Sequence, residues 1–245
     1  GAEYIGRVFP EVIWHAEKPI LRTAPAPLFL LSKLVRESGY KVVLTGEGSD
    51  EVLAGYDIFK EVKIRKFLER APRSAWRPLI LKRLYPYLAN SPVRSLPYAE
   101  AFFRADQSGY PDIFQSHTTR WSTTSRTRMF FSPEMRHKLE GYRNIDELKG
   151  TMTAGNGGND PLSQAQYLEI KTLLAGYLLS SQGDRVAMAH SIEGRFPFLD
   201  HRVIEFCCKL PPTIRMQGLT EKYVLRKSMR NILPESILTR TKQPY

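Results

Sequence analysis

The stretch that decides the fold is residues 42–51, Val-Val-Leu-Thr-Gly-Glu-Gly-Ser-Asp-Glu. Its first three residues are apolar and two of them are β-branched, which predicts a strand buried on both faces of a parallel sheet. Gly46 and Gly48 then mark a turn whose backbone N–H groups can approach an anion closely. Ser49 is a good N-cap, so Asp50 is expected in the first turn of a helix. Because ligands bind at the carboxyl ends of strands in open α/β sheets, this turn is the first candidate for a site.

Helical patterns surround this strand. Residues 28–37 predict a mostly buried helix that ends before Gly39, a residue suited to the left-handed position after a helix. Residues 12–15, Val-Ile-Trp-His, predict a short strand, and no second strand as good as residues 40–45 follows. From Asp57 onward helices dominate. The sequence therefore predicts a helix-rich α/β fold with one or two strands.

The segment after Asp57 is basic as well as helical. Its apolar residues form a stripe at helical spacing, and its lysines and arginines are expected on a solvated face. Residues 76–88 predict a second basic helix, and residues 151–159 form a glycine-rich loop. Asp160 is expected to cap the next helix, with Pro161 at its first position.

Composition excludes some classes of protein. The 245 residues are 42% hydrophobic and 25% charged, as in ordinary globular proteins, and hold no apolar run of the length that a membrane helix needs. The two adjacent cysteines, Cys207 and Cys208, provide neither a disulfide framework nor metal-ligand spacing, so a reducing cytoplasm is expected. Three explanations are open for the net charge of +11: binding to nucleic acid, a solvated basic face together with a nucleotide site, or an acidic segment elsewhere that balances the charge. Nucleic acid is the least favoured, because no nucleic-acid-binding motif accompanies the charge.

Two further stretches carry charged residues close to turns. Residues 182–201 hold Asp184 and Arg185 at an expected helix end, and Glu193 and Arg195 around an expected turn. These charges suit either a network that holds a loop or a binding site. In residues 218–226, Thr220 is expected to cap a helix with Lys222 in its first turn. A cation at the N-terminal end of a helix interacts unfavourably with the helix dipole, and an anion bound at the same end would offset this cost.

The three stretches together resemble the synthetase domain of glutamine-hydrolysing asparagine synthetases. Residues 46–51 match its Gly-Glu-Gly-Ser/Ala-Asp-Glu turn, with Ala54-Gly55-Tyr56 in the place of the usual Gly-Gly-Tyr. Residues 184–200 match Asp-Arg-x-x-Met-Ala-x-x-x-Glu-x-Arg-x-Pro-Phe-Leu-Asp, and residues 222–226 match Lys-x-x-Leu-Arg. The resemblance implies a partial Rossmann-like nucleotide-binding domain of the adenine nucleotide alpha hydrolase type. The resemblance extends from about Arg22 to Tyr245, and it assigns residues 1–245 to the C-terminal portion of that domain.

The resemblance also implies a chemistry. The family activates the side-chain carboxylate of aspartate with MgATP, and ammonia from glutamine then displaces AMP to give asparagine, with pyrophosphate released earlier. Glu47 and Lys222 would be the catalytic residues: Glu47 would act on ammonia, and Lys222 would contact the ATP phosphates and the leaving pyrophosphate. The nucleotide-binding residues would be Thr45, Gly46, Arg22 and Asp184. Asp50 would hold Mg²⁺.

Two parts of the family pattern are missing from these 245 residues. Neither the pyrophosphate loop Ser-Gly-Gly-x-Asp-Ser nor the glutaminase domain with its N-terminal cysteine occurs in them, so this chain alone is expected to be inactive. The expected partners are small substrates and a glutaminase domain that supplies ammonia, and the full-length protein is expected to be able to form a homodimer. The alternatives are a β-lactam or other natural-product amide synthetase with a different acceptor, a non-catalytic domain, and a nucleic-acid-binding protein.

Overall fold

The computed structural model describes residues 1–20, 22–85, 87, 95–104, 112–152, 158 and 160–240. The chain divides into two compact units. Unit 1 comprises Gly1–Tyr56 and Leu168–Tyr245, and unit 2 comprises Asp57–Tyr167. Most of the predicted glycine-rich loop, residues 153–157 and 159, lies outside the described residues.

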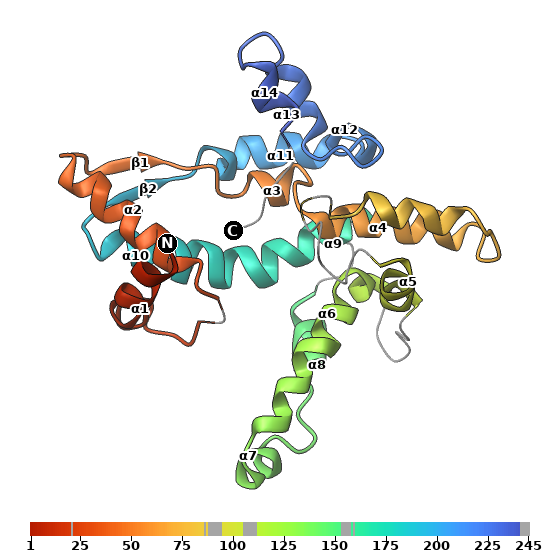
Figure 1. Cartoon of the computed structure of the whole chain (residues 1–245), viewed down its shortest axis with the longest axis horizontal. Helices are drawn as coiled ribbons and strands as arrows, with labels where there is room; N and C mark the ends of the chain where they lie inside the picture. Colours follow the sequence, from red (N-terminus) through yellow and green to blue (C-terminus); the bar gives the residue numbers. More distant parts are fainter. Residues whose placement is uncertain are drawn as a thin grey trace. The chain divides into compact units, whose positions relative to one another are not determined.

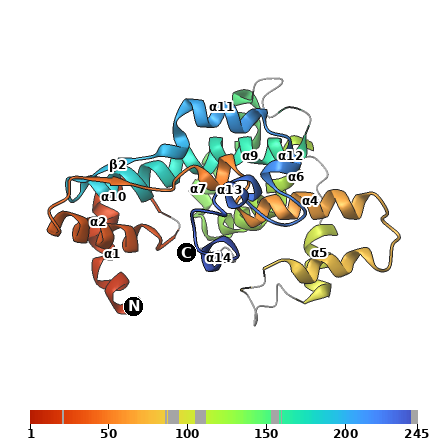
Figure 2. The same cartoon turned by 90° about the horizontal axis from the view of Figure 1, so that it is seen from above.

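Unit 1 contains both strands of the described chain together with long and short helices (Figures 1 and 2). Its elements are α1 (Ala2–Ala16), α2 (Pro25–Glu37), β1 (Val42–Leu44), α3 (Ser49–Val52), the π-helix η5 (Ile170–Asp184), α10 (Arg185–Met188), β2 (Glu193–Arg195), the 3-10 helix η6 (Pro197–Leu199), α11 (His201–Lys209), α12 (Pro212–Arg215), α13 (Tyr223–Ser228) and α14 (Glu235–Leu238).

The first core of unit 1 lies among α1, α2 and α10. Val12 and Phe29 are buried there with Val186, and Ile5 and Phe9 pack against them. The apolar residues of α1 therefore follow helical spacing. The predicted strand at residues 12–15 is wrong for this reason: its residues complete the apolar face of a helix that begins ten residues earlier.

The two strands form a parallel pair, which lies beside α2 and α10 in Figures 1 and 2. Val43 pairs with Gly194. Helix-rich α/β architecture is thus confirmed, but β1 is not buried on both faces, because Val42 is 44% and Leu44 72% exposed. A turn was predicted around Glu193 and Arg195, but these residues form the strand β2. Its three residues, Glu-Gly-Arg, have none of the apolar or β-branched character on which strand prediction depends.

A second core in unit 1 joins the turn after β1 to the C-terminal helices. Val52 and Leu53 are buried against Cys207 of α11, and Val224 of α13 packs on the same cluster. Asp200 caps α11, as predicted, by accepting a hydrogen bond from the backbone N–H of Arg202 at 2.9 Å. This packing fixes α3 and α13 against a common core.

The described part of unit 2 is helical. Its elements are α4 (Asp57–Glu69), the 3-10 helix η1 (Arg77–Arg83), α5 (Leu96–Arg104), the 3-10 turn η3 (Asp112–Phe114), α6 (Gln115–Ser125), the 3-10 helix η4 (Arg126–Phe130), α7 (Pro133–Lys138), α8 (Asn144–Thr151) and α9 (Pro161–Glu169), whose last two residues belong to unit 1. The predicted cap on α9 is confirmed, because Asp160 accepts a hydrogen bond from the Ser163 backbone N–H at 2.8 Å.

The basic residues of α4 are not all on a solvated face, contrary to the prediction. Lys60 is buried and pairs with Asp57 at 3.1 Å, and Arg65 is buried and donates to the backbone oxygen of Phe103 at 3.0 Å. Buried charges persist only with such partners. Helical periodicity alone could not reveal these pairs, because their partners are set by the tertiary fold.

Candidate active site

The turn after β1 is held by backbone contacts. The Thr45 N–H donates to the Arg195 oxygen at 2.9 Å, which extends the parallel pairing by one residue. Gly48 then adopts φ 85° and serves as the N-cap of α3. Ser49 was predicted to be this cap, but it is the first helical residue, because glycine takes the left-handed conformation without strain. A Cβ on Gly48 would also lie 2.1 Å from Cδ2 of Leu199.

Asp50 and Lys222 meet beside this turn. Nζ of Lys222 lies 3.0 Å from Oδ1 of Asp50 and donates to Oγ of Ser49 at 2.9 Å. The two charged side chains are 15% and 21% exposed, so the pair is partly shielded from water. A cation and a carboxylate that lie on opposite sides of unit 2 in the sequence therefore form one small polar cluster. A sequence pattern on either side alone does not show this contact.

Gly55 provides the space for this pair. A Cβ at position 55 would lie 2.0 Å from Oδ1 of Asp50 and 2.4 Å from Cε of Lys222. No real Cβ tolerates such distances, so a side chain would displace both charged groups. The backbone N–H of Gly55 also donates to the backbone oxygen of Asp50 at 2.7 Å, and this bond closes the short helix α3. The need for glycine here comes from close packing.

Lys222 occupies an unusual backbone position. It was predicted to lie in the first turn of a helix capped by Thr220, but α13 begins at Tyr223 and Lys222 is its N-cap residue. Its φ of 49° and ψ of 36° are left-handed, a conformation that costs a non-glycine residue roughly 1–2 kcal/mol. Strained backbone of this kind concentrates at functional sites. From this backbone position the lysine side chain reaches Asp50.

The other predicted residues of the turn are Thr45, Gly46 and Glu47. Glu47 is half-buried, and Gly46 accepts a hydrogen bond from the Ser49 N–H at 3.2 Å. The hydroxyl of Thr45 is buried and has no hydrogen-bond partner within the described part of the chain. An unsatisfied buried hydroxyl costs about 1–3 kcal/mol. A ligand that reached this hydroxyl after a side-chain rotation would remove that cost.

Arg22 and Asp184 do not join the cluster. Both are exposed, and neither forms a hydrogen bond or ion pair with Asp50 or Lys222 in the ranges that the structure describes. Arg22 lies near Tyr177, where burial raises the pKa of the phenol and the arginine opposes that rise. Asp184 ends η5, which continues directly into α10. It therefore does not follow the end of a helix as predicted.

The sequence analysis gives no role to Glu51, which the structure places in the first turn of α3. Its side chain is almost fully buried and accepts a hydrogen bond from the Tyr56 hydroxyl at 2.7 Å. Burial raises the pKa of the Glu51 carboxyl, and the nearby charges of Asp50 and Glu169 raise it further, while the Tyr56 hydrogen bond opposes them. The signal in the sequence was the tyrosine five residues later, whose hydroxyl reaches back to α3.

Arg226, the last residue of the Lys-x-x-Leu-Arg match, has a structural place. Its guanidinium donates to the carboxylate of Glu221 at 2.6 Å and to the backbone oxygen of Arg240 at 3.1 Å, and it also bonds the oxygen of Leu238. Glu221 is buried. Arg226 therefore ties α13 to the segment that follows α14, and holds the helix that begins at Lys222.

The residues described by the structure contain no group of three or more histidine, cysteine, aspartate or glutamate side chains arranged to hold a metal ion. Asp50 is a single carboxylate with a lysine partner. This set fits Mg²⁺ that is bound largely by substrate phosphates and water, since Mg²⁺ is commonly held by one or two carboxylates in nucleotide sites. Among the described residues, no helix is long and apolar enough to span a bilayer.

The sequence matches the family model described as asparagine synthase over residues 2–245. The chain belongs to the asparagine synthase family. It is 30% identical over 242 residues to "Asparagine synthetase [glutamine-hydrolyzing] 1" of Bacillus subtilis, covering 98% of this chain and 35% of that protein. It is 28% identical over 259 residues to "Amidase chyE" of Penicillium rubens, covering 99% of this chain and 37% of that protein.

A shorter match reaches higher identity. Over 62 residues, 25% of this chain and 8% of the relative, the chain is 48% identical to "Asparagine synthetase [glutamine-hydrolyzing] 2" of Bacillus subtilis. The relatives that match nearly all of this chain are longer proteins, and the chain spans about a third of their length. The family resemblance inferred from the three motifs is therefore confirmed.

Proposed function

We propose that this chain forms part of the synthetase site of an ATP-dependent amide-forming ligase. In the complete enzyme, that site adenylates the side-chain carboxylate of aspartate and passes the acyl group to ammonia, giving asparagine, AMP and pyrophosphate. The observation that carries the proposal is the contact between Lys222 and Asp50 at the carboxyl end of β1. In open α/β sheets this edge is where ligands bind. Membership of the asparagine synthase family supports the reaction class.

Lys222 and Asp50 have complementary tasks in this proposal. Before ATP binds, each neutralises the other, which keeps both side chains ordered in a partly shielded place. When the triphosphate binds, its oxygens are the stronger partner for the ammonium group of Lys222, which then stabilises the charge that grows on departing pyrophosphate. Asp50 is released to hold Mg²⁺, which would supply further neutralisation of the phosphate charge.

Glu47 and Thr45 are assigned to the acyl end and the nucleotide. Glu47 is half-buried on the turn, two residues before the Ser49 hydroxyl that Lys222 contacts. A carboxylate there would orient ammonia and accept its proton as the amide bond forms. Thr45 offers a hydroxyl that lacks a partner among the described residues, which suits a nucleotide contact. Gly46 leaves the backbone open to close approach.

We also propose that this chain alone does not turn over. The backbone oxygen of Lys41 and the backbone N–H of Thr45 form hydrogen bonds with β2. Backbone groups of successive residues in a parallel strand point to opposite edges, so the N–H and C=O groups of Val42 and Leu44 point to the edge of β1 that faces away from β2. No other described strand pairs with that edge. An exposed parallel strand is unusual, because such sheets are normally covered. The site therefore needs further polypeptide, which in the complete enzyme would include a phosphate-binding loop and a glutaminase domain that supplies ammonia.

A second candidate is a natural-product amide synthetase that uses another acceptor carboxylate. The similarity to relatives named amidases favours it. Glu47 within the intact Gly-Glu-Gly-Ser-Asp-Glu turn favours asparagine formation instead. Under either candidate the adenylation step is the same, so only the acceptor distinguishes them.

The test is pyrophosphate release by the complete enzyme with ATP, Mg²⁺ and a panel of carboxylate acceptors. Release that depends on aspartate, followed by asparagine formation with ammonia, is the expected result. Release with another carboxylate and none with aspartate would replace asparagine synthesis with the second candidate. No nucleotide-dependent release with any acceptor would contradict both, and would leave a non-catalytic domain.

A further inference from the structure

An exposed aromatic turn lies at the end of an arm in unit 2, away from α4 and α5 of the same unit (Figure 1). The turn joins η4 to α7. Phe130 is 82% exposed there, and Met129 is 68% exposed. Exposed apolar residues are common singly, but a cluster on a protruding turn indicates an interaction surface. The proposed ligase activity gives these residues no role.

The turn is held in one conformation by Arg136. Its guanidinium donates to the backbone oxygen of Phe131 at 3.1 Å and to that of Met129 at 2.7 Å. Ser132 caps α7 by accepting from the Met135 N–H at 3.2 Å. An ordered aromatic turn loses little conformational entropy when it binds. Aromatic residues, methionine and arginine are also the residues enriched in protein interfaces.

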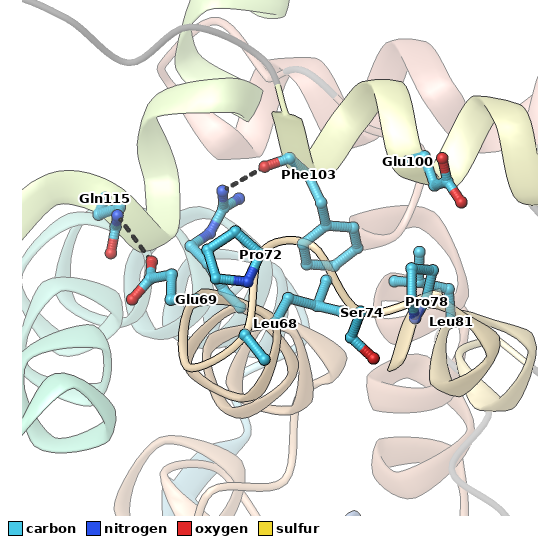
Figure 3. Close-up of a pocket in the computed structure, with 11 residues that line it drawn as sticks. Leu68, Glu69, Pro72, Ser74, Pro78, Leu81, Glu100, Phe103 and Gln115 are labelled. Carbon is cyan, nitrogen blue, oxygen red and sulfur yellow. Dashed lines mark hydrogen bonds between the residues drawn. The ribbon is translucent and has the colours of Figure 1, made fainter. Parts of the chain in front are cut away.

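Unit 2 also contains an apolar pocket of about 350 Å³ between α4, η1 and α5 (Figure 3). Leu68, Leu81 and Phe103 are part of its wall, and Arg65 keeps Phe103 in place by bonding its backbone oxygen and stacking 5.2 Å from its ring centre. Glu69 also lines the pocket. Its carboxylate contacts Lys66 and Gln115.

We propose that Phe130 of one copy of this chain docks into this pocket of a second copy. A cavity of about 150 Å³ accepts a benzene ring, so about 350 Å³ holds the phenyl ring with part of a neighbouring side chain. The exposed arginines Arg126 and Arg128 lie close to Phe130 in the sequence. The charged residues that line the pocket are Glu69, Glu100 and Arg65, so acidic groups outnumber basic ones there and complement the arginines. The proposal is independent of the ligase reaction.

The geometry allows more than one kind of assembly. A contact between turn and pocket can occur twice across a two-fold axis, which produces a dimer, or repeat in one direction, which produces a ring or an open chain of copies. The net charge of +11 opposes self-association, so the attraction must come from this local match. A membrane surface is less favoured as the occupant, because α7 has six residues and offers little helical face for a bilayer interface.

The test uses two variants of the chain that each remove one half of the contact. Phe130→Ser removes the ring and keeps the pocket, while Ala71→Trp fills the pocket, which Ala71 lines, and keeps the ring. Glu100→Lys is a second pocket variant, which reverses a charge without adding bulk. Trp14→Ser is the matched control, because Trp14 is equally exposed, at 80%, in unit 1. Circular dichroism verifies that each variant is folded.

Sedimentation velocity gives the result. Wild type and Trp14→Ser should associate as concentration rises, and each turn or pocket variant should associate at least about tenfold more weakly. An equimolar mixture of Phe130→Ser and Ala71→Trp should form dimers and nothing larger. The intact turn of Ala71→Trp can bind the intact pocket of Phe130→Ser, and no second contact can then form.

The proposal is overturned by a wild type that stays monomeric, by a Phe130→Ser variant that associates like wild type, or by a mixture that forms no dimer. Pelleting of monomeric wild type, but not Phe130→Ser, with vesicles containing phosphatidylserine would also overturn it, and would assign the turn to a membrane surface.

Discussion

Nζ of Lys222 lies 3.0 Å from Oδ1 of Asp50, in the space left by the missing side chain of Gly55. The ammonium group also donates to the Ser49 hydroxyl at 2.9 Å. The start of α13 is thereby joined to the start of α3, over a shared apolar core that includes Val52 and Val224. Local backbone geometry, packing and charge all contribute to this contact, and each can be tested separately.

Gly55→Ala should disrupt this contact. The added Cβ would overlap Asp50 and Lys222, so we expect a loss of about 1–3 kcal/mol in unfolding free energy and loss of activity in the complete enzyme. Denaturant unfolding and pyrophosphate release measure the two effects. Gly150→Ala is the control, because no atom lies within 4 Å of a Cβ at that position. Equal behaviour of the two variants would contradict the packing argument.

Glu47→Gln should separate the two half-reactions of the complete enzyme. The amide keeps the size of the side chain but cannot accept a proton from ammonia, so amide formation should fall by about 10²–10⁴-fold. ATP binding and aspartate-dependent pyrophosphate release should remain. Rates of asparagine formation and pyrophosphate release, measured on the same preparation, make the comparison. Undiminished asparagine synthesis would refute the assigned role of Glu47.

Glu51→Gln should change how stability depends on pH. Burial raises the pKa of Glu51 above its ordinary value of 4.5, so the folded state binds a proton more tightly than the unfolded state. The protonated carboxyl therefore stabilises the fold below pH 4.5, and this contribution is lost as pH rises from there through the folded pKa. The variant has no such proton, and its amide oxygen can still accept the Tyr56 hydrogen bond.

We therefore expect the melting temperature of Glu51→Gln, relative to wild type, to increase as pH rises above 4.5 and then to level off. Differential scanning fluorimetry at a series of pH values measures this difference. Glu205→Gln, at an exposed position of α11, is the control and should show no comparable trend. A difference between wild type and Glu51→Gln that does not depend on pH would contradict the burial argument.

Thr45→Val tests the hydroxyl that has no partner in the described part of the chain. Valine has nearly the same shape and removes an unsatisfied polar atom, so stability should be unchanged or slightly higher. If this hydroxyl contacts the nucleotide, the affinity of the complete enzyme for ATP should fall about 5- to 10-fold. Isothermal titration and thermal unfolding measure the two quantities. A drop in stability without a change in affinity would indicate a structural role.

The sequence predicted several features of this fold that depend on neighbouring residues, although not the caps of α3 and α13. The caps of α9 and α11 need only an aspartate before a helix, and both are found at Asp160 and Asp200. The end of α2 near Gly39 has the same local origin, since glycine adopts the positive φ of 86°. The strand after α2, β1, was also predicted. The exposure of β1 was not predicted, because the burial of a strand depends on which other elements cover it.

The features that the sequence did not predict depend on distant contacts. β2 is polar and pairs because α10 and η6 place it beside β1. Residues 12–15 belong to a helix because Val12 packs against Phe29 and Val186. The left-handed Lys222 and the buried Glu51 both result from packing around α3. Motif likeness predicted a site at the turn after β1, whereas the ion pair between Asp50 and Lys222 is seen only in the three-dimensional structure.

The most direct test of the assigned role of Lys222 is aspartate-dependent exchange of pyrophosphate into ATP by the complete enzyme. Lys222→Ala should lower this exchange by about 10²–10³-fold with a folded protein, because the charge on departing pyrophosphate loses its neutralising partner. Lys227→Ala, at an exposed position of the same helix, should exchange like wild type. Exchange by Lys222→Ala at the wild-type rate would contradict the account.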